Sequence, residues 1–279
     1  MEKQMPTLKM LANDRRRFLA ENADCDFTII SEPISKVVLS VPHAVEQVWL
    51  GKHKGREIGS ITTALYLQKT SHCSLIAKTK NNNDDANFDE FSPYKDALEE
   101  YIRRNDIEFL IDIHSLSSKR DMGINLGLHL GYNIKDYEGV FDYLHKELLK
   151  NNFTVSIDAP FMASGNTVCN SMKKKFENLF AIQIEINSKI TKQEGNFDRH
   201  CLLISIMEKW IKLIDKTFQK KVKKNKKTCW QQKNFIVYYK SIRCRGVAQL
   251  VAHVAWDHGV GSSSLSTPTR NALYTLEGL

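Results

Sequence analysis

Short apolar runs alternate with helical patterns along the chain between residues 36 and 218. Lys36–Pro42 is rich in β-branched residues, which is typical of a buried strand. Ser92 and Pro93 predict the start of a helix, because serine is a common N-cap residue and proline fits the first helical turn. The same reasoning predicts strands at Lys36–Pro42, Ser74–Lys78, Glu108–Ile113, Ile124–Leu130, Phe153–Ile157 and Leu179–Ile186, and helices at Ile58–Lys69, Ser92–Asn105, Asp136–Lys150, Asn166–Asn178 and His200–Phe218.

This alternation predicts an α/β fold: a single three-layer domain with a mainly parallel, mixed sheet flanked by helices, plus a basic C-terminal extension. The domain is expected at residues 35–218, after an N-terminal helical segment at 1–34. In such folds the functional residues gather at the carboxyl ends of the strands. His43, His114 and Glu185 all lie at or near the ends of predicted strands.

The composition is that of a globular protein. Hydrophobic residues make up 42% of the chain and charged residues 26%, which excludes a wholly disordered, collagenous or membrane-embedded chain. The six cysteines are scattered without a C-x-x-C pair, and the N-terminus lacks the apolar run of a signal peptide. No run reaches 18 apolar residues, so no membrane span is expected. These features predict a reduced, cytoplasmic protein.

The net charge of +8 belongs to the end of the chain. Residues 216–279 carry a net charge of +10, which leaves residues 1–215 with −2. The extension at 219–279, with its basic run Lys220–Lys227, is therefore expected to be a disordered tail. Within this tail, Arg245–His253 and Gly261–Thr269 resemble the conceptual translation of a transfer-RNA gene. That resemblance suggests a reading frame that has run into a neighbouring gene.

Two histidines at strand ends suggest a metal site. His43 and His114, with a nearby carboxylate, form the pattern of three protein ligands and one open position that is typical of catalytic zinc. Glu46 and Glu57 compete for the third place: Glu46 gives a His-x-x-Glu spacing, and Glu57 begins the next helix. Zn²⁺, as a single ion, is the expected cofactor, since it lowers the pKa of water and polarises a scissile carbonyl.

Glu185 is the candidate general base. It stands between isoleucines on a predicted strand, and an unpaired carboxylate is costly to bury there unless it has a function. Desolvation would raise its pKa toward a value useful for proton transfer.

The order of these short motifs resembles that of the N-formylglutamate amidohydrolase family, which is similar in fold to the zinc carboxypeptidases and aminoacylases. The resemblance covers about residues 35–215 and implies an amidohydrolase-like catalytic domain. The motifs that carry it are Ser40–Val45, Lys54, Glu57, Asn82–Asn87, Ile111–Ser115 and Gln183–Asn187.

The resemblance implies a role for each matching residue. His43, His114 and Glu57 would hold the metal, with Glu46 as the alternative to Glu57, and Glu185 would activate water. Asn87 matches the asparagine of a D-x-N-R motif and would hydrogen-bond the substrate or the developing oxyanion.

Phe88 replaces the arginine of that motif, which would hold a substrate carboxylate. Lys54, Lys80 or Arg120 would then supply the positive charge.

The sequence therefore predicts a zinc-dependent hydrolase that cleaves an amide bond of a small N-acyl amino acid similar to N-formylglutamate. One alternative is a catalytically inactive relative that acts as a binding protein. Another is RNA binding through the basic run Lys220–Lys227. No nucleic-acid site is expected elsewhere in the chain, and no membrane partner is expected.

Overall fold

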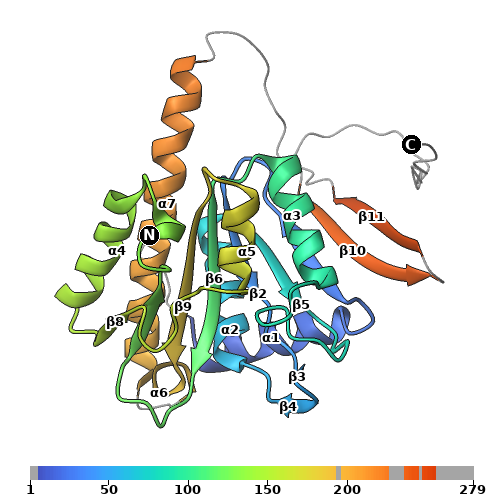
Figure 1. Cartoon of the computed structure of the whole chain (residues 1–279), viewed down its shortest axis with the longest axis horizontal. Coiled ribbons are helices and arrows are strands. Elements are labelled where there is room, and N and C mark those ends of the chain that lie inside the picture. Colours follow the sequence, from blue (N-terminus) through green and yellow to red (C-terminus); the bar gives the residue numbers. More distant parts are fainter. Residues whose placement is uncertain (1–5, 193–195, 226–235, 245–246, 256–279) are drawn as a thin grey trace, which may run out of the picture.

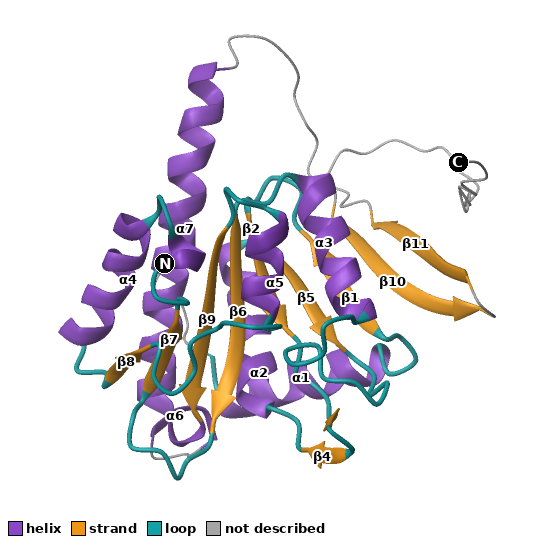
Figure 2. Ribbon diagram, in the orientation of Figure 1, coloured by secondary structure: helices purple, strands orange, loops and turns teal. Residues whose placement is uncertain are grey.

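A mixed β-sheet with helices on both faces forms the body of the protein (Figures 1 and 2). The structure is a computed structural model that describes residues 6–192, 196–225, 236–244 and 247–255, with side chains for 6–191 and 196–215. The strands are β1 (Phe27–Ser31), β2 (Val37–Val41), β3 (Gln47–Trp49), β4 (Lys52–Lys54), β5 (Ser74–Lys78), β6 (Phe109–Leu116), β7 (Ile124–Gly127), β8 (Val155–Ile157), β9 (Phe180–Asn187), β10 (Ile236–Cys244) and β11 (Val247–Ala255). The helices are α1 (Leu8–Glu21), α2 (Ile58–Ser71), α3 (Pro93–Asn105), α4 (Glu138–Lys150), α5 (Val168–Lys175), α6 (Ser188–Lys192) and α7 (Phe197–Asn225), with a 3₁₀ turn η1 (Tyr132–Ile134).

The strand order of the main sheet is β11-β10-β1-β5-β2-β6-β9-β7-β8. The central strands β5, β2, β6 and β9 are mutually parallel, whereas β1 runs antiparallel to β5 and β7 runs antiparallel to β9. The short hairpin of β3 and β4 forms a separate two-stranded sheet. Because four neighbouring strands point the same way, their carboxyl ends meet at one edge of the sheet.

Helices cover both faces of this sheet, which makes three layers (Figure 2). One apolar core joins α2, α4 and α7 to one face of the strands, and a second joins α3 and α5 to the other. Alternate residues of β2 enter different cores: Val37 and Leu39 belong to the first and Val38 to the second. The predicted α/β class, with a mixed sheet flanked by helices, is confirmed.

The predicted elements correspond to observed ones with shifts of a few residues at their ends. Ser92 caps α3 as expected, since its side chain accepts a hydrogen bond from Lys95 N and Pro93 occupies the first turn. Two features were not predicted from the sequence. One is β1, which lies inside the segment 1–34 and pairs with β5; the other is the hairpin of β3 and β4.

The segment 219–279 contains the end of α7 and the strands β10 and β11. These strands pair with each other, and β10 also pairs with β1. Residues 226–235, 245–246 and 256–279 lie outside the described part, as do the side chains of Lys220–Lys227. The three-segment division, the transfer-RNA-like tail and RNA binding therefore stay predictions. None of the described helices has the length and hydropathy needed to cross a bilayer.

Candidate metal centre and active-site cavity

The carboxyl ends of β2 and β6 bring the two predicted histidines together. His43 follows β2, and His114 lies near the end of β6, which is the parallel neighbour of β2. Glu57 precedes α2, and its backbone N–H donates to the carbonyl oxygen of His43 at 2.9 Å. The backbone N–H of Ser115 donates to Oε2 of Glu57 at 2.8 Å. These two backbone hydrogen bonds fix the glutamate against both strand ends.

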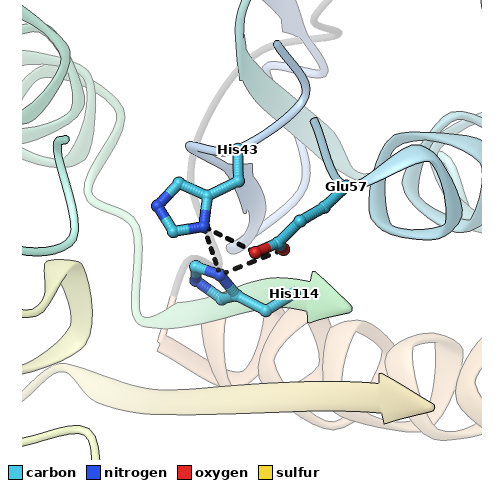
Figure 3. A group of neighbouring side chains, drawn as sticks. All are labelled: His43, Glu57 and His114. Atoms are coloured by element: carbon cyan, nitrogen blue, oxygen red, sulfur yellow. Dashed lines mark hydrogen bonds and ion pairs between the residues drawn. The ribbon is translucent and has the colours of Figure 1, made fainter. Parts of the chain in front are cut away.

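The ligand-type atoms of these three residues converge on one point (Figure 3). Nδ1 of His43 lies 2.9 Å from Oε1 of Glu57 and 3.1 Å from Nδ1 of His114. Nδ1 of His114 lies 3.4 Å from Oε2 of Glu57. Two nitrogens bound to one tetrahedral zinc ion lie about 3.3 Å apart, given bond lengths of about 2.05 Å. The observed separation fits a shared ion.

A second carboxylate stands behind each histidine. Nε2 of His43 donates to Oδ1 of Asp85 at 2.8 Å, and Nε2 of His114 donates to Oδ2 of Asp112 at 2.9 Å. When each imidazole is neutral, as a metal ligand must be, these hydrogen bonds hold its proton on Nε2, so both Nδ1 atoms present lone pairs to the centre. Lone pairs from two nitrogens and a carboxylate repel one another unless a cation lies between them. The donor set therefore fits a divalent metal ion.

The pKa values at the centre reflect the same convergence. Burial opposes ionisation of Glu57, but the charges and hydrogen bonds of His43 and His114 hold its pKa well below the usual range. Burial also opposes protonation of His114, yet Asp112 and Glu57 raise the pKa of this histidine well above its ordinary value. The shift of His114 reflects carboxylates that stabilise positive charge at this point, and the shift of Glu57 keeps its carboxylate ionised beside the two histidines.

Glu185 lies beside the centre on the next parallel strand. It is the register partner of His114 on β9, is 6% exposed, and accepts a hydrogen bond from Nε2 of Gln183 at 2.9 Å. Burial raises the pKa of Glu185 to about 7, in the range that suits a group that both takes and releases a proton near neutral pH. Nδ2 of Asn87 donates to Oε1 of Gln183 at 3.4 Å, which links three polar side chains in a row.

A cavity of about 740 Å³ opens over these residues. Its lining comprises His43, Trp49, Lys52, His53, Lys54, Asp85, Asn87, Phe88, His114, Pro160, Phe161, Met162, Ala163, Ser164, Thr167, Gln183 and Glu185. The volume matches that of a site for a small organic ligand. Two candidate ligands, His43 and His114, and the candidate base Glu185 therefore line one accessible chamber.

The remaining predicted site residues are placed differently. Glu46 is exposed and is not part of the His43–Glu57–His114 cluster, so Glu57 is the carboxylate that the structure brings to the histidines. Nζ of Lys54 lies 3.6 Å from Oε1 of Glu57. Lys80 is exposed and does not line the cavity.

Arg120 is exposed and does not line the cavity, but its Cζ lies 5.0 Å from the ring centroid of Phe161, which does. Asn87 lines the cavity with both ends of its amide engaged, since its Oδ1 accepts from Val168 N at 2.9 Å.

Asp85 and Gln183 are the polar residues whose contacts the sequence reasoning missed. Asp85 precedes Asn87 in the polar loop between β5 and α3, but no spacing rule joins it to His43, which lies 42 positions earlier. Gln183 and Glu185 are two positions apart on one strand, so their side chains lie on the same face of the sheet. This spacing was the one signal in the sequence for their contact.

The fold and the cluster together define an α/β protein with a buried His–Glu–His centre that could hold a metal ion. No protein-family model matches the chain, and no curated protein matches it. Among solved structures, a gene product of Agrobacterium tumefaciens matches with 15% identity and a TM-score of 0.50, over 72% of this chain and 99% of that chain.

N-formylglutamate amidohydrolase from Ralstonia eutropha JMP134 matches with 13% identity and a TM-score of 0.47, over 71% of this chain and 99% of that chain. A bacteriophage poly-γ-glutamate hydrolase matches with 13% identity and a TM-score of 0.47, over 77% and 97%. At 15% identity, the Agrobacterium match shows a shared fold alone. Membership of the N-formylglutamate amidohydrolase family stays a prediction.

Proposed function

We propose that the chain is a metal-dependent hydrolase that cleaves the amide bond of a small N-acyl amino acid. The observation that carries this proposal is the convergence of two Nδ1 lone pairs and one carboxylate, each histidine being backed by its own aspartate. His43, Glu57 and His114 would hold the ion. The substrate class follows from the motif order in the sequence, and zinc follows from the nitrogen and oxygen donor set.

The chain's own residues divide the remaining work. A divalent ion such as zinc, when bound, lowers the pKa of water and polarises the amide carbonyl. Glu185 takes a proton from the attacking water and passes it to the leaving nitrogen. The C–N bond breaks, a C–O bond to the water oxygen forms, and the products are a carboxylate and a protonated amine. Gln183 holds the Glu185 carboxylate in position through its 2.9 Å hydrogen bond.

The test combines metal removal with a variant of the proposed base. The full chain should hydrolyse N-formyl or N-acetyl amino acids, lose activity on dialysis against a chelator, and regain it with zinc. Glu185→Gln should keep its metal and lose about 10²–10⁴-fold in kcat, the usual contribution of a general acid–base group. Glu46→Gln, a change at an exposed glutamate, is the matched control and should retain activity. Activity that survives metal removal, or full activity in Glu185→Gln, would contradict the proposal.

A further inference from the structure

The cavity above the candidate centre has two unlike walls. Strand β4 contributes Lys52, His53 and Lys54, all exposed, to one side. The loop before α5 contributes Pro160, Phe161 and Met162 to the lining. A ligand that fills the chamber therefore meets positive charge from the hairpin and apolar surface from the loop.

The charge of Lys52 and the ring nitrogens of His53 are available for a ligand. Lys54 is partly engaged, because its Nζ lies 3.6 Å from Oε1 of Glu57 and 3.5 Å from Nδ1 of His43. Neither Lys52 nor His53 forms an ion pair within the part of the chain whose side chains are described. Asp85, which also lines the cavity, is likewise committed through its hydrogen bond with His43. An anionic ligand group is therefore matched by Lys52 and His53 at the hairpin.

Aromatic side chains also line the cavity. Trp49 of β3 and Phe88 of the polar loop pack edge to face, with ring centroids 5.5 Å apart and an interplanar angle of 86°. They remain 41% and 44% exposed although both line the cavity. Large aromatic surfaces left exposed in a chamber are typical of a binding site for an apolar ligand group.

The apolar wall is held in place by hydrogen bonds beneath it. Nδ2 of Asn125, a fully buried residue, donates to the carbonyl oxygen of Ala159 at 3.0 Å. The backbone N–H of His129 donates to the carbonyl oxygen of Met162 at 2.7 Å. Such a wall is formed before the ligand arrives, so little ordering free energy is lost on binding.

We infer that this site selects N-acyl amino acids with an aromatic or large aliphatic side chain, whose α-carboxylate binds Lys52 and His53. The side chain packs among Trp49, Phe88 and Phe161. This inference rests on the proposed amide hydrolysis for the identity of the scissile bond, but the recognition it describes is measurable as binding alone. It assigns specificity to the hairpin and loop rather than to Lys80 or Arg120.

The experiment measures binding and hydrolysis separately. Dissociation constants of N-formylphenylalanine, N-formylglutamate and N-formylphenethylamine, which lacks the carboxylate, are determined with the zinc-loaded Glu185→Gln chain. The same variant additionally carries Lys52→Met with His53→Gln, or Phe161→Ala. Lys119→Met and Leu149→Ala, changes at exposed residues that do not line the cavity, are the matched controls. Hydrolysis of the three compounds is followed with the wild-type chain.

We expect N-formylphenylalanine to bind at least tenfold more tightly than N-formylglutamate, because it buries a phenyl group. It should also bind at least tenfold more tightly than N-formylphenethylamine, because it keeps the carboxylate that Lys52 and His53 bind. Loss of Lys52 and His53 should abolish the preference over phenethylamine, and Phe161→Ala should reduce the preference over glutamate. Equal or tighter binding of N-formylglutamate, or preferences unchanged in the cavity variants, would overturn the inference. Selective binding without hydrolysis by the wild type would uphold the inference and contradict the proposed function. Hydrolysis by the wild type that favours N-formylglutamate would uphold the proposed function and contradict the inference.

Discussion

Replacing Asp85 with asparagine tests the carboxylate that stands behind His43. Asp85 is 4% exposed, and its Oδ1 accepts the hydrogen bond from Nε2 of His43 at 2.8 Å. Burial raises the pKa of Asp85, but the hydrogen bond and charge of His43 outweigh it and bring the pKa to about 2, against an ordinary 3.8. At 1.36 kcal/mol per pKa unit, this environment stabilises the ionised carboxylate by about 2 kcal/mol.

An asparagine at position 85 changes which nitrogen of His43 carries the proton. The amide can donate to Nε2, which then accepts, so the proton moves to Nδ1 and points at the place where a cation would bind. Mutation of the residue that hydrogen-bonds a metal-binding histidine typically weakens metal affinity about 10–100-fold. That range corresponds to about 1.4–2.8 kcal/mol of binding free energy.

The assay is competition for zinc with a chromophoric chelator near neutral pH. Asp85→Asn should bind zinc about 10–100-fold more weakly than the wild type. Asp142→Asn, a change at an exposed aspartate on α4, is the matched control and should leave the affinity unchanged. Equal zinc affinity in all three chains would refute the reasoning that Asp85 fixes the tautomer of His43.

Two further predictions concern stability. His200 is buried, and burial lowers its pKa to about 4 from 6.5. As the pH falls, the histidine is therefore protonated in the unfolded chain before it is protonated in the folded one. The free energy of unfolding should drop by about 3 kcal/mol between pH 7 and pH 4. Chemical denaturation across this range should show a smaller drop in His200→Gln, and an identical pH dependence would count against the assignment. Gly59→Ala would place a Cβ 2.8 Å from Cβ of Thr191, so α2 and α6 must separate at a cost of about 1–3 kcal/mol. The Tm should fall in thermal unfolding, whereas Gly139→Ala, whose Cβ meets nothing within 4 Å, should not lower it; equal Tm values for the two variants would contradict this packing.

Strand-end reasoning explains why much of the candidate site was predictable. In a parallel sheet the carboxyl ends of neighbouring strands meet, so His43 and His114 could be placed together although 71 positions separate them. Glu185 followed from the cost of burying a carboxylate on an apolar strand. The choice between Glu46 and Glu57 depended on the turn after β2, which no periodicity specifies.

The parts that escaped prediction depend on contacts between loops. Asp85 belongs to a polar loop without strand or helix periodicity, so its approach to His43 could not be read from spacing. The hairpin of β3 and β4 ends in Lys52-His53-Lys54, a polar run without the apolar alternation of a half-buried strand. The pairing of Trp49 with Phe88 likewise depends on how this hairpin folds over the polar loop.

The central claim is that His43, Glu57 and His114 hold one metal ion, and metal content tests it most directly. The purified full-length chain is loaded with zinc and freed of excess metal, and its zinc content is measured by inductively coupled plasma mass spectrometry. The wild type and Glu46→Gln should each contain one zinc ion per chain, and His43→Ala combined with His114→Ala should contain almost none while retaining the helical circular dichroism of the wild type. A double variant that keeps the wild-type zinc content would contradict the account.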